Sequence, residues 1–386
     1  MKKLRIMTVV GTRPEIIRLS ATIKLLDEYA NQVFVHTGQN YDYELNEIFF
    51  DDLGLRKPDH FMNADVSSLG ASIGDIFKKT EELILLEKPD ALLVLGDTNS
   101  CLSAYMAKRK HIPIFHMEAG NRSFDFNVPE EINRRVIDHL ADFNLVYTEH
   151  ARRHLLSEGL QHRRIYLTGS PMYEVLQQNK EKIDNSKAIT NLNKQISNKG
   201  NQIAPQKFFM VSIHREENVD NSKNLNKILT ALNRLAAEYQ LPVIVSTHPR
   251  TRKRIELLIN KSQFTNELIY FMKPFSFTDY VNLQKNAVCT ISDSGTISEE
   301  SAILNFPAIS IRQSMERPEA QDTGSIILTG FDTDIIINAV KAEIDSNQIQ
   351  PKDIPIEYQI ENTSFRVVKL ILGNTKLSNK WWGINK

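Results

Sequence analysis

The stretch His116–Arg135, HMEAGNRSFDFNVPEEINRR, decides how we interpret the rest of the chain. A short apolar run leads into Glu118, and a break at Gly120 follows it. Pro129 then opens a stretch with helical spacing, and Glu130 stands in its first turn. The pattern places carboxylates at the end of a strand, which is where an open α/β sheet usually carries its ligand site.

Length and charge exclude several classes of protein. The 386 residues are enough for two domains of ordinary size. Lys+Arg and Asp+Glu both number 47, so the net charge is zero, which argues against a broad surface for nucleic acid or anionic membrane but allows local basic clusters. Apolar runs such as residues 91–95 are too short to cross a bilayer. We therefore expect no nucleic-acid partner and no membrane insertion.

Neither a signal peptide nor a cofactor motif is expected. The N-terminal apolar run continues into Arg13 and Glu15 without a small-residue cleavage pattern, so we interpret it as a first strand. Cys101 and Cys289 have no CxxC partner, which predicts no disulfide framework, no zinc and a cytoplasmic location. The sequence has no HExxH, GxGxxG or GxxxxGK[ST] motif, so we predict no metal and no cofactor.

Apolar runs alternate with helical stretches, which predicts an α/β fold with doubly wound parallel sheets. The strands are expected at residues 4–10, 33–36, 91–96, 112–116, 144–148 and 165–168, and then at 208–213, 243–247, 268–272, 288–292 and 307–311. The polar stretch 180–206 allows a partly helical segment, but it has no sustained apolar stripe, so we expect an exposed connection there.

Two series of this kind predict two Rossmann-like domains that face each other across a cleft. We expect the first domain at residues 1–170 plus 364–386 and the second at residues 171–363. In this interpretation the C-terminal helix near residues 365–372 packs back on the first domain.

The segment Gly11–Glu15, GTRPE, follows the first expected strand. Pro14 suits the first helical position, and free amides at a helix start attract phosphate. Arg13, with Arg18 one turn later, would add charge-assisted hydrogen bonds. The alternative is an ordinary strand-to-helix turn with a surface arginine.

Carboxylates follow two of the other expected strands. Asp97 comes after the most apolar run, but Asp97 or Thr98 can instead cap the next helix, and taken alone we favour the cap. Glu130 and Glu131 have an ordinary explanation, because a helix macrodipole stabilises acidic residues in the first turn by about 0.3–1 kcal/mol. No such effect explains Glu118.

The second half carries polar residues after several strands. His214 follows the run 208–213 and can donate a hydrogen bond or exchange a proton near neutral pH, although a plain capped loop is the alternative. The segment 248–250, HPR, is a secondary candidate after the next strand.

A further candidate for phosphate binding is the turn Ser294–Thr296, which offers backbone amides and hydroxyl groups. Glu300, one turn later, suits a ribose diol. The alternative is a capping box in which Asp293 or Ser294 caps the helix. Arg317 follows the next expected strand.

With these residues assembled, the chain resembles the non-hydrolysing UDP-N-acetylglucosamine 2-epimerase family over essentially its whole length. The matching segments, in the family's order, are GTRPE, LGDT, HMEAG, PEE.NR, a strand ending in HRE, SDSG.ISEE and ERPE. The resemblance implies a glycosyltransferase-B-like fold, UDP held mainly by the second domain, the sugar in the cleft, and a homodimer.

Some segments resemble one branch of that family, the UDP-N-acetyl-L-fucosamine synthases of capsule and O-antigen pathways. These segments are HTGQNYDYELNEIFFDDLGLR, EAGNRSFDFNVPEEINR, HREENVD, STHPRTRKR and KPFSFTDY. The branch epimerises UDP-2-acetamido-2,6-dideoxy-L-talose at C2. Arg18 stands where the ordinary epimerases have lysine, and Phe275 where they have a polar residue. UDP-N-acetylglucosamine 2-epimerase is the alternative, and a glycosyltransferase, a hydrolysing epimerase or a UDP-sugar sensor is more distant.

The resemblance also implies site residues, for elimination of UDP across C1–C2 followed by its re-addition. Asp97, Glu118 and Glu130 become the acid and base candidates, in an order that the sequence leaves open. His214 completes the catalytic set at the diphosphate. The other expected contacts with the UDP-sugar are Arg13, Arg18, Asn121, Arg122, Arg215, Phe275, Tyr280, Ser294, Gly295, Thr296, Glu300 and Arg317. We expect the loop 121–128 to determine which sugar is accepted.

Overall fold

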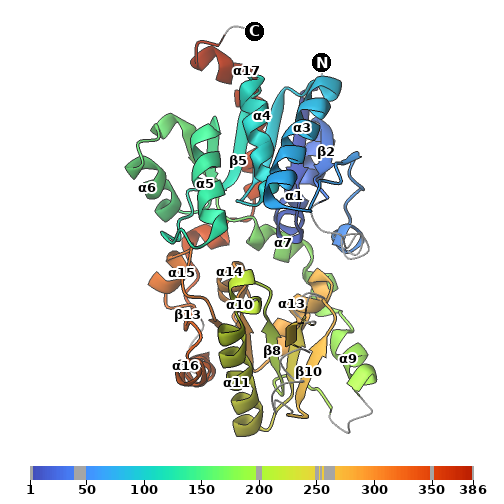
Figure 1. Cartoon of the computed structure of the whole chain (residues 1–386), viewed down its shortest axis with the longest axis vertical. Helices are drawn as coiled ribbons and strands as arrows, with labels where there is room; N and C mark the ends of the chain where they lie inside the picture. The colour runs from blue at the N-terminus through green and yellow to red at the C-terminus, as the bar shows by residue number, and fades with distance from the viewer. Residues whose placement is uncertain are drawn as a thin grey trace. The chain divides into compact units, whose positions relative to one another are not determined.

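The computed structural model describes residues 3–38, 49–196, 202–247, 252, 254–255, 266–347 and 352–384. The chain divides into two compact units, Met1–Gln178 with Ile356–Lys386, and Asn179–Pro355 (Figure 1). Each unit has its own parallel sheet with helices packed around it. The prediction of two Rossmann-like α/β domains is confirmed.

The sheet of the first unit has seven parallel strands in the order β3-β2-β1-β4-β5-β6-β7. Their bounds are β1 Arg5–Val10, β2 Asn31–His36, β3 His60–Phe61, β4 Ala91–Leu95, β5 Ile114–Ala119, β6 Phe143–Val146 and β7 Ile165–Leu167. Every residue of the central strand β4 is buried. A continuous apolar run of this kind is what a strand covered on both faces requires.

The helices of the first unit connect these strands. They are α1 Arg13–Tyr29, α3 Leu69–Glu87, α4 Ser103–Arg109, α5 Pro129–Leu140, α6 Glu149–Ser157, α7 Met172–Gln178 and α17 Thr363–Trp381, with the short 3-10 helices η1 Asn99–Leu102, η2 His162–Arg164 and η4 Ile356–Gln359. Helix α17, red in Figure 1, returns to the first unit and packs against α1. The prediction for the C-terminal helix is confirmed, and the helix is longer than the stretch 365–372.

The second unit repeats the same arrangement, with six parallel strands in the order β10-β9-β8-β11-β12-β13. The strands are β8 Phe209–Ser212, β9 Val243–Ser246, β10 Ile269–Met272, β11 Cys289–Ser292, β12 Ala308–Ser310 and β13 Ile327–Leu328. The helices are α8 Lys180–Asp184, α9 Ala188–Ile196, α10 Glu216–Val219, α11 Ser222–Tyr239, α13 Phe277–Asn286, α14 Ile297–Leu304, α15 Glu319–Asp322 and α16 Thr333–Asn347.

The prediction of an exposed connection at residues 180–206 is wrong. Helices α8 and α9 occupy most of it, and Ala188, Leu192 and Ile196 are buried in a cluster that includes Phe208. These three side chains recur every fourth residue, so they lie on one face of α9. A short stripe of this kind is enough to bury a helix of nine residues.

The boundaries of the first unit differ from those expected. Its first segment ends at residue 178 in place of 170, and its second segment begins at residue 356 in place of 364. Helix α7 packs on α1 and η4 packs on α7, which keeps both elements in the first unit. The candidate segment 248–250 lies outside the described residues. Each helix that the structure describes is too short or too polar to span a membrane.

Candidate active site

Two of the expected carboxylates lie side by side at one edge of the first sheet. Strands β4 and β5 pair in parallel, with Leu95 opposite Met117, so the residues that follow lie at the same edge. Asp97 follows β4, and Glu118 is the fifth residue of β5. A Cβ on Gly96 would lie 3.6 Å from Glu118 Oε2, which places Glu118 against the backbone that leads to Asp97.

The backbone at Glu118 has an uncommon conformation. Its φ is +65°, and the β5–β6 ladder has a bulge between Met117 and Ala119. A non-glycine residue with a left-handed backbone conformation costs about 1–3 kcal/mol, and such residues are concentrated at functional sites. Bulges are also common next to active sites, where they redirect a side chain. Gly120 then has φ +79°, and a Cβ there would lie 2.4 Å from the carbonyl oxygen of Ala151. The turn after Glu118 therefore requires glycine.

The carboxylate of Glu118 is held by two neighbours. Arg18, from α1, forms an ion pair with Oε2, and each side chain is only 9% exposed. Asn121 Nδ2 donates to Oε1 at 3.4 Å. A buried carboxylate needs such partners, because an unpaired buried charge is strongly destabilising.

Asp97 pairs with Arg134 of α5, whose Nε lies 3.1 Å from Oδ2. The prediction that Asp97 or Thr98 caps the following helix is wrong, because neither side chain makes a cap hydrogen bond. Thr98 Oγ1 instead donates to Glu15 Oε1 at 3.0 Å. Asp97 is therefore held by a cation from another helix.

Glu15 is a buried link between two loops, and the sequence interpretation did not assign it a role. It accepts hydrogen bonds from the amides of Gly11 and Thr12 at 2.7 and 2.6 Å, and from Ser100 Oγ at 2.5 Å. Burial raises the pKa of Glu15, although these hydrogen bonds act in the opposite direction. The contacts fix the GTRPE loop, and with it Arg13, whose guanidinium lies 5.5 Å from the ring centre of Phe49.

The two glutamates at the start of α5 differ. Glu131 is fully buried and accepts from the Ser123 amide at 2.9 Å and from Arg134 Nη1 at 2.8 Å. Burial alone would raise the pKa of Glu131, but the Ser123 amide and the arginines lower it. Glu130 is half-buried and has no ion pair with any residue that the structure describes. Of the two, Glu130 is therefore the more accessible carboxylate.

A buried charge network lies beneath this loop. Asp138 accepts from the Gly120 amide at 3.1 Å and from Arg122 Nη1 at 2.7 Å, and His116 Nδ1 lies 3.0 Å from its Oδ1. Burial would raise the pKa of Asp138, but His116 and Arg122 lower it. Arg122, expected at the sugar, is 1% exposed and also pairs with Glu158. Because Arg122 is buried and ion-paired, a role in positioning the loop fits it better than direct contact with a ligand.

The second unit holds His214 in a fixed orientation. Asp293, which is fully buried, accepts from the backbone amides of His214 and Arg215 at 3.0 Å and from Asn218 Nδ2 at 2.8 Å. His214 Nδ1 lies 2.9 Å from Asp293 Oδ1, and the histidine side chain is 44% exposed. Burial would raise the pKa of Asp293, but His214 and the other donors lower it strongly. Asp293 therefore orients the ring so that Nε2 is available, and it does not cap the next helix.

Arginines of the second unit have acidic partners. Arg317 pairs with Glu299, and both side chains are almost fully buried. Arg215 Nη2 lies 3.5 Å from Glu316 Oε1, which Arg312 also contacts at 2.5 Å. These side chains follow β8, β11 and β12, which are neighbours in the sheet.

The turn after β11 has half-buried hydroxyls. Ser294 Oγ and Thr296 Oγ1 are 2.9 Å apart, with Gly295 between them. Thr296 is the N-cap residue of α14 and makes no side-chain cap bond. Glu300 accepts from Gln284 Nε2 at 2.8 Å.

The two expected aromatic contacts, Phe275 and Tyr280, are partly buried side chains. Tyr280 and Phe275 pack against the cluster around Phe208. Burial raises the pKa of Tyr280 above its ordinary value.

Together these residues supply two kinds of chemistry, each in its own unit. The first unit presents carboxylates that can exchange protons, held by buried arginines. The second presents His214, with Arg215 next to it, after strand β8, and both side chains suit a negatively charged group. The sequence interpretation missed Glu15, Arg134, Asp138 and Asp293 as partners of these groups.

Comparisons with known proteins show the family to which the chain belongs. The family model described as UDP-N-acetylglucosamine 2-epimerase matches residues 25–372. The UDP-N-acetylglucosamine 2-epimerase of Methanococcus maripaludis is 37% identical over 345 residues, which cover 88% of this chain and 92% of that protein. The UDP-2,3-diacetamido-2,3-dideoxy-D-glucuronate 2-epimerase of Pseudomonas aeruginosa is 32% identical over 345 residues, with the same coverage of 88% and 92%.

Solved structures are similar over nearly the whole chain. The UDP-N-acetylglucosamine 2-epimerase of Rickettsia bellii has a TM-score of 0.90 and 44% identity, covering 98% of this chain and 100% of that chain. The Methanocaldococcus jannaschii enzyme, solved with UDP-GlcNAc and UDP, has a TM-score of 0.86 and 31% identity, covering 95% and 99%. The glycosyltransferase-B-like fold is confirmed. The chain therefore belongs to the non-hydrolysing UDP-N-acetylglucosamine 2-epimerase family, and it is a UDP-sugar 2-epimerase, which is an isomerase.

Proposed function

We propose that this enzyme converts UDP-2-acetamido-2,6-dideoxy-L-talose to UDP-N-acetyl-L-fucosamine, for a capsule or O-antigen polysaccharide. The observation that carries the proposal is the environment of Glu118, whose carboxylate is contacted by Arg18 and Asn121. The ordinary UDP-N-acetylglucosamine epimerases have lysine at the first position and leucine at the second, where EAGL replaces EAGN. Both departures thus converge on one carboxylate.

These replacements change how the carboxylate is held. A guanidinium is a planar group with several donors, whereas an ammonium is a compact point charge, so arginine fixes the orientation of Glu118 more strictly than lysine. Asn121 adds a donor that leucine lacks. Such a difference at an acid–base group suits a sugar whose C2 hydrogen is presented in another orientation.

The loop between the catalytic candidates also supports a 6-deoxy sugar. Phe124 and Phe126 are 66% and 67% exposed, and the guanidinium of Arg135 lies 5.2 Å from the ring centre of Phe126. A 6-deoxy sugar carries a methyl group where N-acetylglucosamine carries a hydroxymethyl group. Exposed phenyl rings favour the less polar substituent.

The proposed reaction proceeds through elimination, because the C2 hydrogen is not α to a carbonyl. A carboxylate takes the C2 proton, the C1–O bond to UDP breaks, and its electrons leave with the diphosphate, which gives a 2-acetamidoglycal. The diphosphate then adds again at C1 while an acid returns a proton to the other face of C2. On this proposal Asp97, Glu118 and Glu130 supply the acid and the base.

The diphosphate and the nucleoside need binding groups of their own. We assign the diphosphate to His214, Arg13 and Arg317, because cations and hydrogen-bond donors stabilise the charge of the leaving group. The turn Ser294–Thr296 and Glu300 are assigned to the phosphates and the ribose. A role for Asp293 follows, since it orients His214.

The second candidate is the conversion of UDP-N-acetylglucosamine to UDP-N-acetylmannosamine. The names of the Methanococcus maripaludis and Rickettsia bellii relatives favour it. The two substrates differ in the configuration and the substituent that the residues around Glu118 would meet. Direct competition between them therefore distinguishes the two functions.

The test compares both UDP-sugars in D2O and follows C2 by NMR. We expect deuterium at C2 with the nucleotide sugar retained, and a higher kcat/KM for the L-talose substrate. Arg18→Lys/Asn121→Leu should shift the ratio of the two kcat/KM values toward UDP-N-acetylglucosamine by about tenfold or more, a size that pocket contacts typically provide. Preference of the wild type for UDP-N-acetylglucosamine would reject the proposed substrate, and turnover only with an acceptor would indicate a transferase.

We also propose that the enzyme is a cytoplasmic homodimer, as is common in the family. Sedimentation velocity at micromolar concentration should then give a species of twice the 44.2 kDa chain mass. A single species of the chain mass at that concentration would contradict the dimer.

A further inference from the structure

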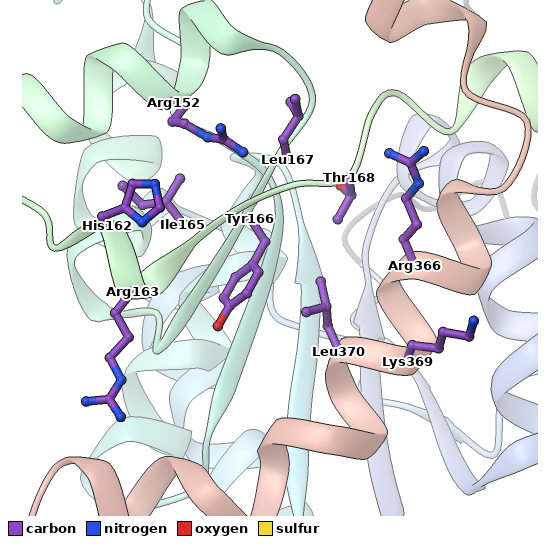
Figure 2. A pocket seen from close by; sticks show the side chains of 10 residues that line it. All are labelled: Arg152, His162, Arg163, Ile165, Tyr166, Leu167, Thr168, Arg366, Lys369 and Leu370. Carbon is purple, nitrogen blue, oxygen red and sulfur yellow. The ribbon is translucent and has the colours of Figure 1, made fainter.

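A basic cavity lies in the first unit, at the edge of its sheet. It has a volume of about 560 Å³, within the range of small-molecule sites. Strand β7 is the last strand of the sheet, and the cavity is bounded by β7, by α6 and η2, and by α17. Figure 2 shows its side chains, which come from elements some 200 residues apart in the sequence. None of them belongs to the proposed catalytic machinery.

The ionisable side chains that line this cavity are mostly basic. The lining includes Arg152, His162, Arg163, Arg366 and Lys369, and no acidic residue. Figure 2 shows Arg152 and Arg366 on opposite sides of the end of β7. Like charges that converge on a concave surface repel each other unless an anion lies between them.

Few carboxylates compensate these cations. Within the described ranges, Arg152 is the one lining residue with an ion pair, to Glu149 at 2.7 Å. Arg366 Nε donates only to the side-chain oxygen of Asn362, at 3.0 Å. Lys369 Nζ lies 4.9 Å from the ring centre of Phe365. Their charges are placed by weak local contacts and remain available to a ligand.

We propose that this cavity binds an anion that carries two or more phosphate groups. Arginine forks recognise phosphate oxygens through paired hydrogen bonds, and cations from both sides of β7 suit a ligand with more than one charged group. The apolar wall formed by Tyr166 and Leu370 accommodates the uncharged part of such a molecule. The phosphates can belong to a soluble diphosphate or to the headgroups of an anionic lipid.

Tryptophan fluorescence can report on ligand binding at this cavity. The two tryptophans of the chain are Trp381 and Trp382, and the guanidinium of Arg163 lies 4.4 Å from the ring centre of Trp381. Arg164 stacks in the same way on Trp382, at 4.8 Å. An anion that draws Arg163 into the cavity changes this contact, so tryptophan fluorescence reports on the cavity and not on the active site.

The experiment titrates the full-length enzyme with inorganic pyrophosphate at constant ionic strength and records tryptophan fluorescence. A parallel arm measures sedimentation with phosphatidylglycerol vesicles against phosphatidylcholine vesicles. Arg366→Ala/Lys369→Ala tests the cavity, since both residues are exposed and their loss should not affect folding. Arg153→Ala is the matched control, because Arg153 is an exposed arginine of α6 outside the cavity.

We expect a saturable fluorescence change or vesicle binding that weakens by roughly tenfold or more in the double variant, as loss of charge-assisted hydrogen bonds implies. Arg153→Ala and UDP-sugar turnover should be unchanged. A response to pyrophosphate alone identifies a soluble ligand, and vesicle binding identifies a headgroup. The proposal is overturned if neither a fluorescence response nor vesicle binding is seen, or if Arg153→Ala weakens binding as much as the double variant does. The cations would then serve to prevent strand pairing at the edge strand β7.

Discussion

Arg134 joins two carboxylates of the candidate active site, Asp97 and the buried Glu131. Arg134→Met leaves Glu131 with Arg135 as its remaining arginine, and a broken buried pair typically costs about 3–5 kcal/mol. We expect a loss of this size in the free energy of unfolding, measured by urea denaturation. Glu131→Gln/Arg134→Met should recover part of the loss, because the buried charge of Glu131 is removed together with its partner, while Asp97 still lacks Arg134. Equal stability of wild type and Arg134→Met would contradict this role.

Asp293 predicts a dependence of stability on pH. Its pKa in the folded enzyme lies well below the ordinary value near 3.9, so its contribution is present above about pH 4 and is lost as the pH falls further. Asp293→Asn should therefore lower the free energy of unfolding by about 1.5–3 kcal/mol at pH 7. The difference from wild type should shrink below pH 4. Urea titrations between pH 3 and 7 measure it, and a difference that does not vary with pH would refute the assignment.

For individual residues, the candidate site residues could be predicted from the sequence more readily than the side chains that contact them. Glu118, Asp97 and His214 follow apolar runs, so their position at strand ends could be predicted. Arg134 and Asp138 lie within helix α5, and Glu15 lies in the first turn of α1, where an acidic residue is ordinary. Besides local contacts, each of the three has a partner distant in the sequence: Asp97 for Arg134, His116 for Asp138 and Ser100 for Glu15. No local pattern predicts such a contact.

The turn after β5 is an element whose geometry can be tested with one methyl group. Gly120→Ala places a Cβ 2.4 Å from the carbonyl of Ala151 and forces alanine to φ +79°. We expect a loss of several kcal/mol in stability, since a left-handed conformation alone costs about 1–3 kcal/mol.

Gly74→Ala is the matched control, because its Cβ meets nothing within 4 Å in the middle of α3. It should raise stability by about 0.5–1 kcal/mol. Thermal unfolding of both variants measures the contrast. A Gly120→Ala variant as stable as Gly74→Ala would show that the turn differs from the one described.

The burial of helix α9 was not expected from the sequence, and it can be tested by mutation. Leu192 is 1% exposed in the core of the second unit, so Leu192→Ala should cost about 2–5 kcal/mol. Asn191→Ala, one residue earlier on the exposed face, should change stability by less than about 0.5 kcal/mol. Urea denaturation distinguishes a buried helix from an exposed connection, for which both variants would be neutral.

The elements that could be predicted share one physical property. Strands such as β4 and β8 are contiguous buried runs, which the sequence reveals directly. The strands β3 and β13 have two residues each and rest on pairing with neighbours, so no run of their own marks them. Helix α9 has three buried apolar side chains among polar ones, and tertiary packing rather than sequence pattern decides its burial.

At the scale of the molecule, each unit places its polar groups at the carboxyl edge of its own parallel sheet. In the first unit these groups are Asp97 and Glu118, and in the second they are His214 and the turn at Ser294. The topology follows from the alternation of strands and helices, so this division could be predicted from the sequence. The exact unit boundaries could not, because they depend on which neighbour α7 and η4 pack against.

The central claim is that the carboxylates of the first unit carry out proton exchange at C2 of a UDP-sugar. The most direct measurement is deuterium incorporation at C2 in D2O, by NMR, for wild type and for Asp97→Asn, Glu118→Gln and Glu130→Gln. We expect incorporation with the nucleotide sugar retained in the wild type, and rates lowered by about 10²–10⁴-fold in the variants while UDP binding persists. Near-normal exchange in all three variants would contradict the claim.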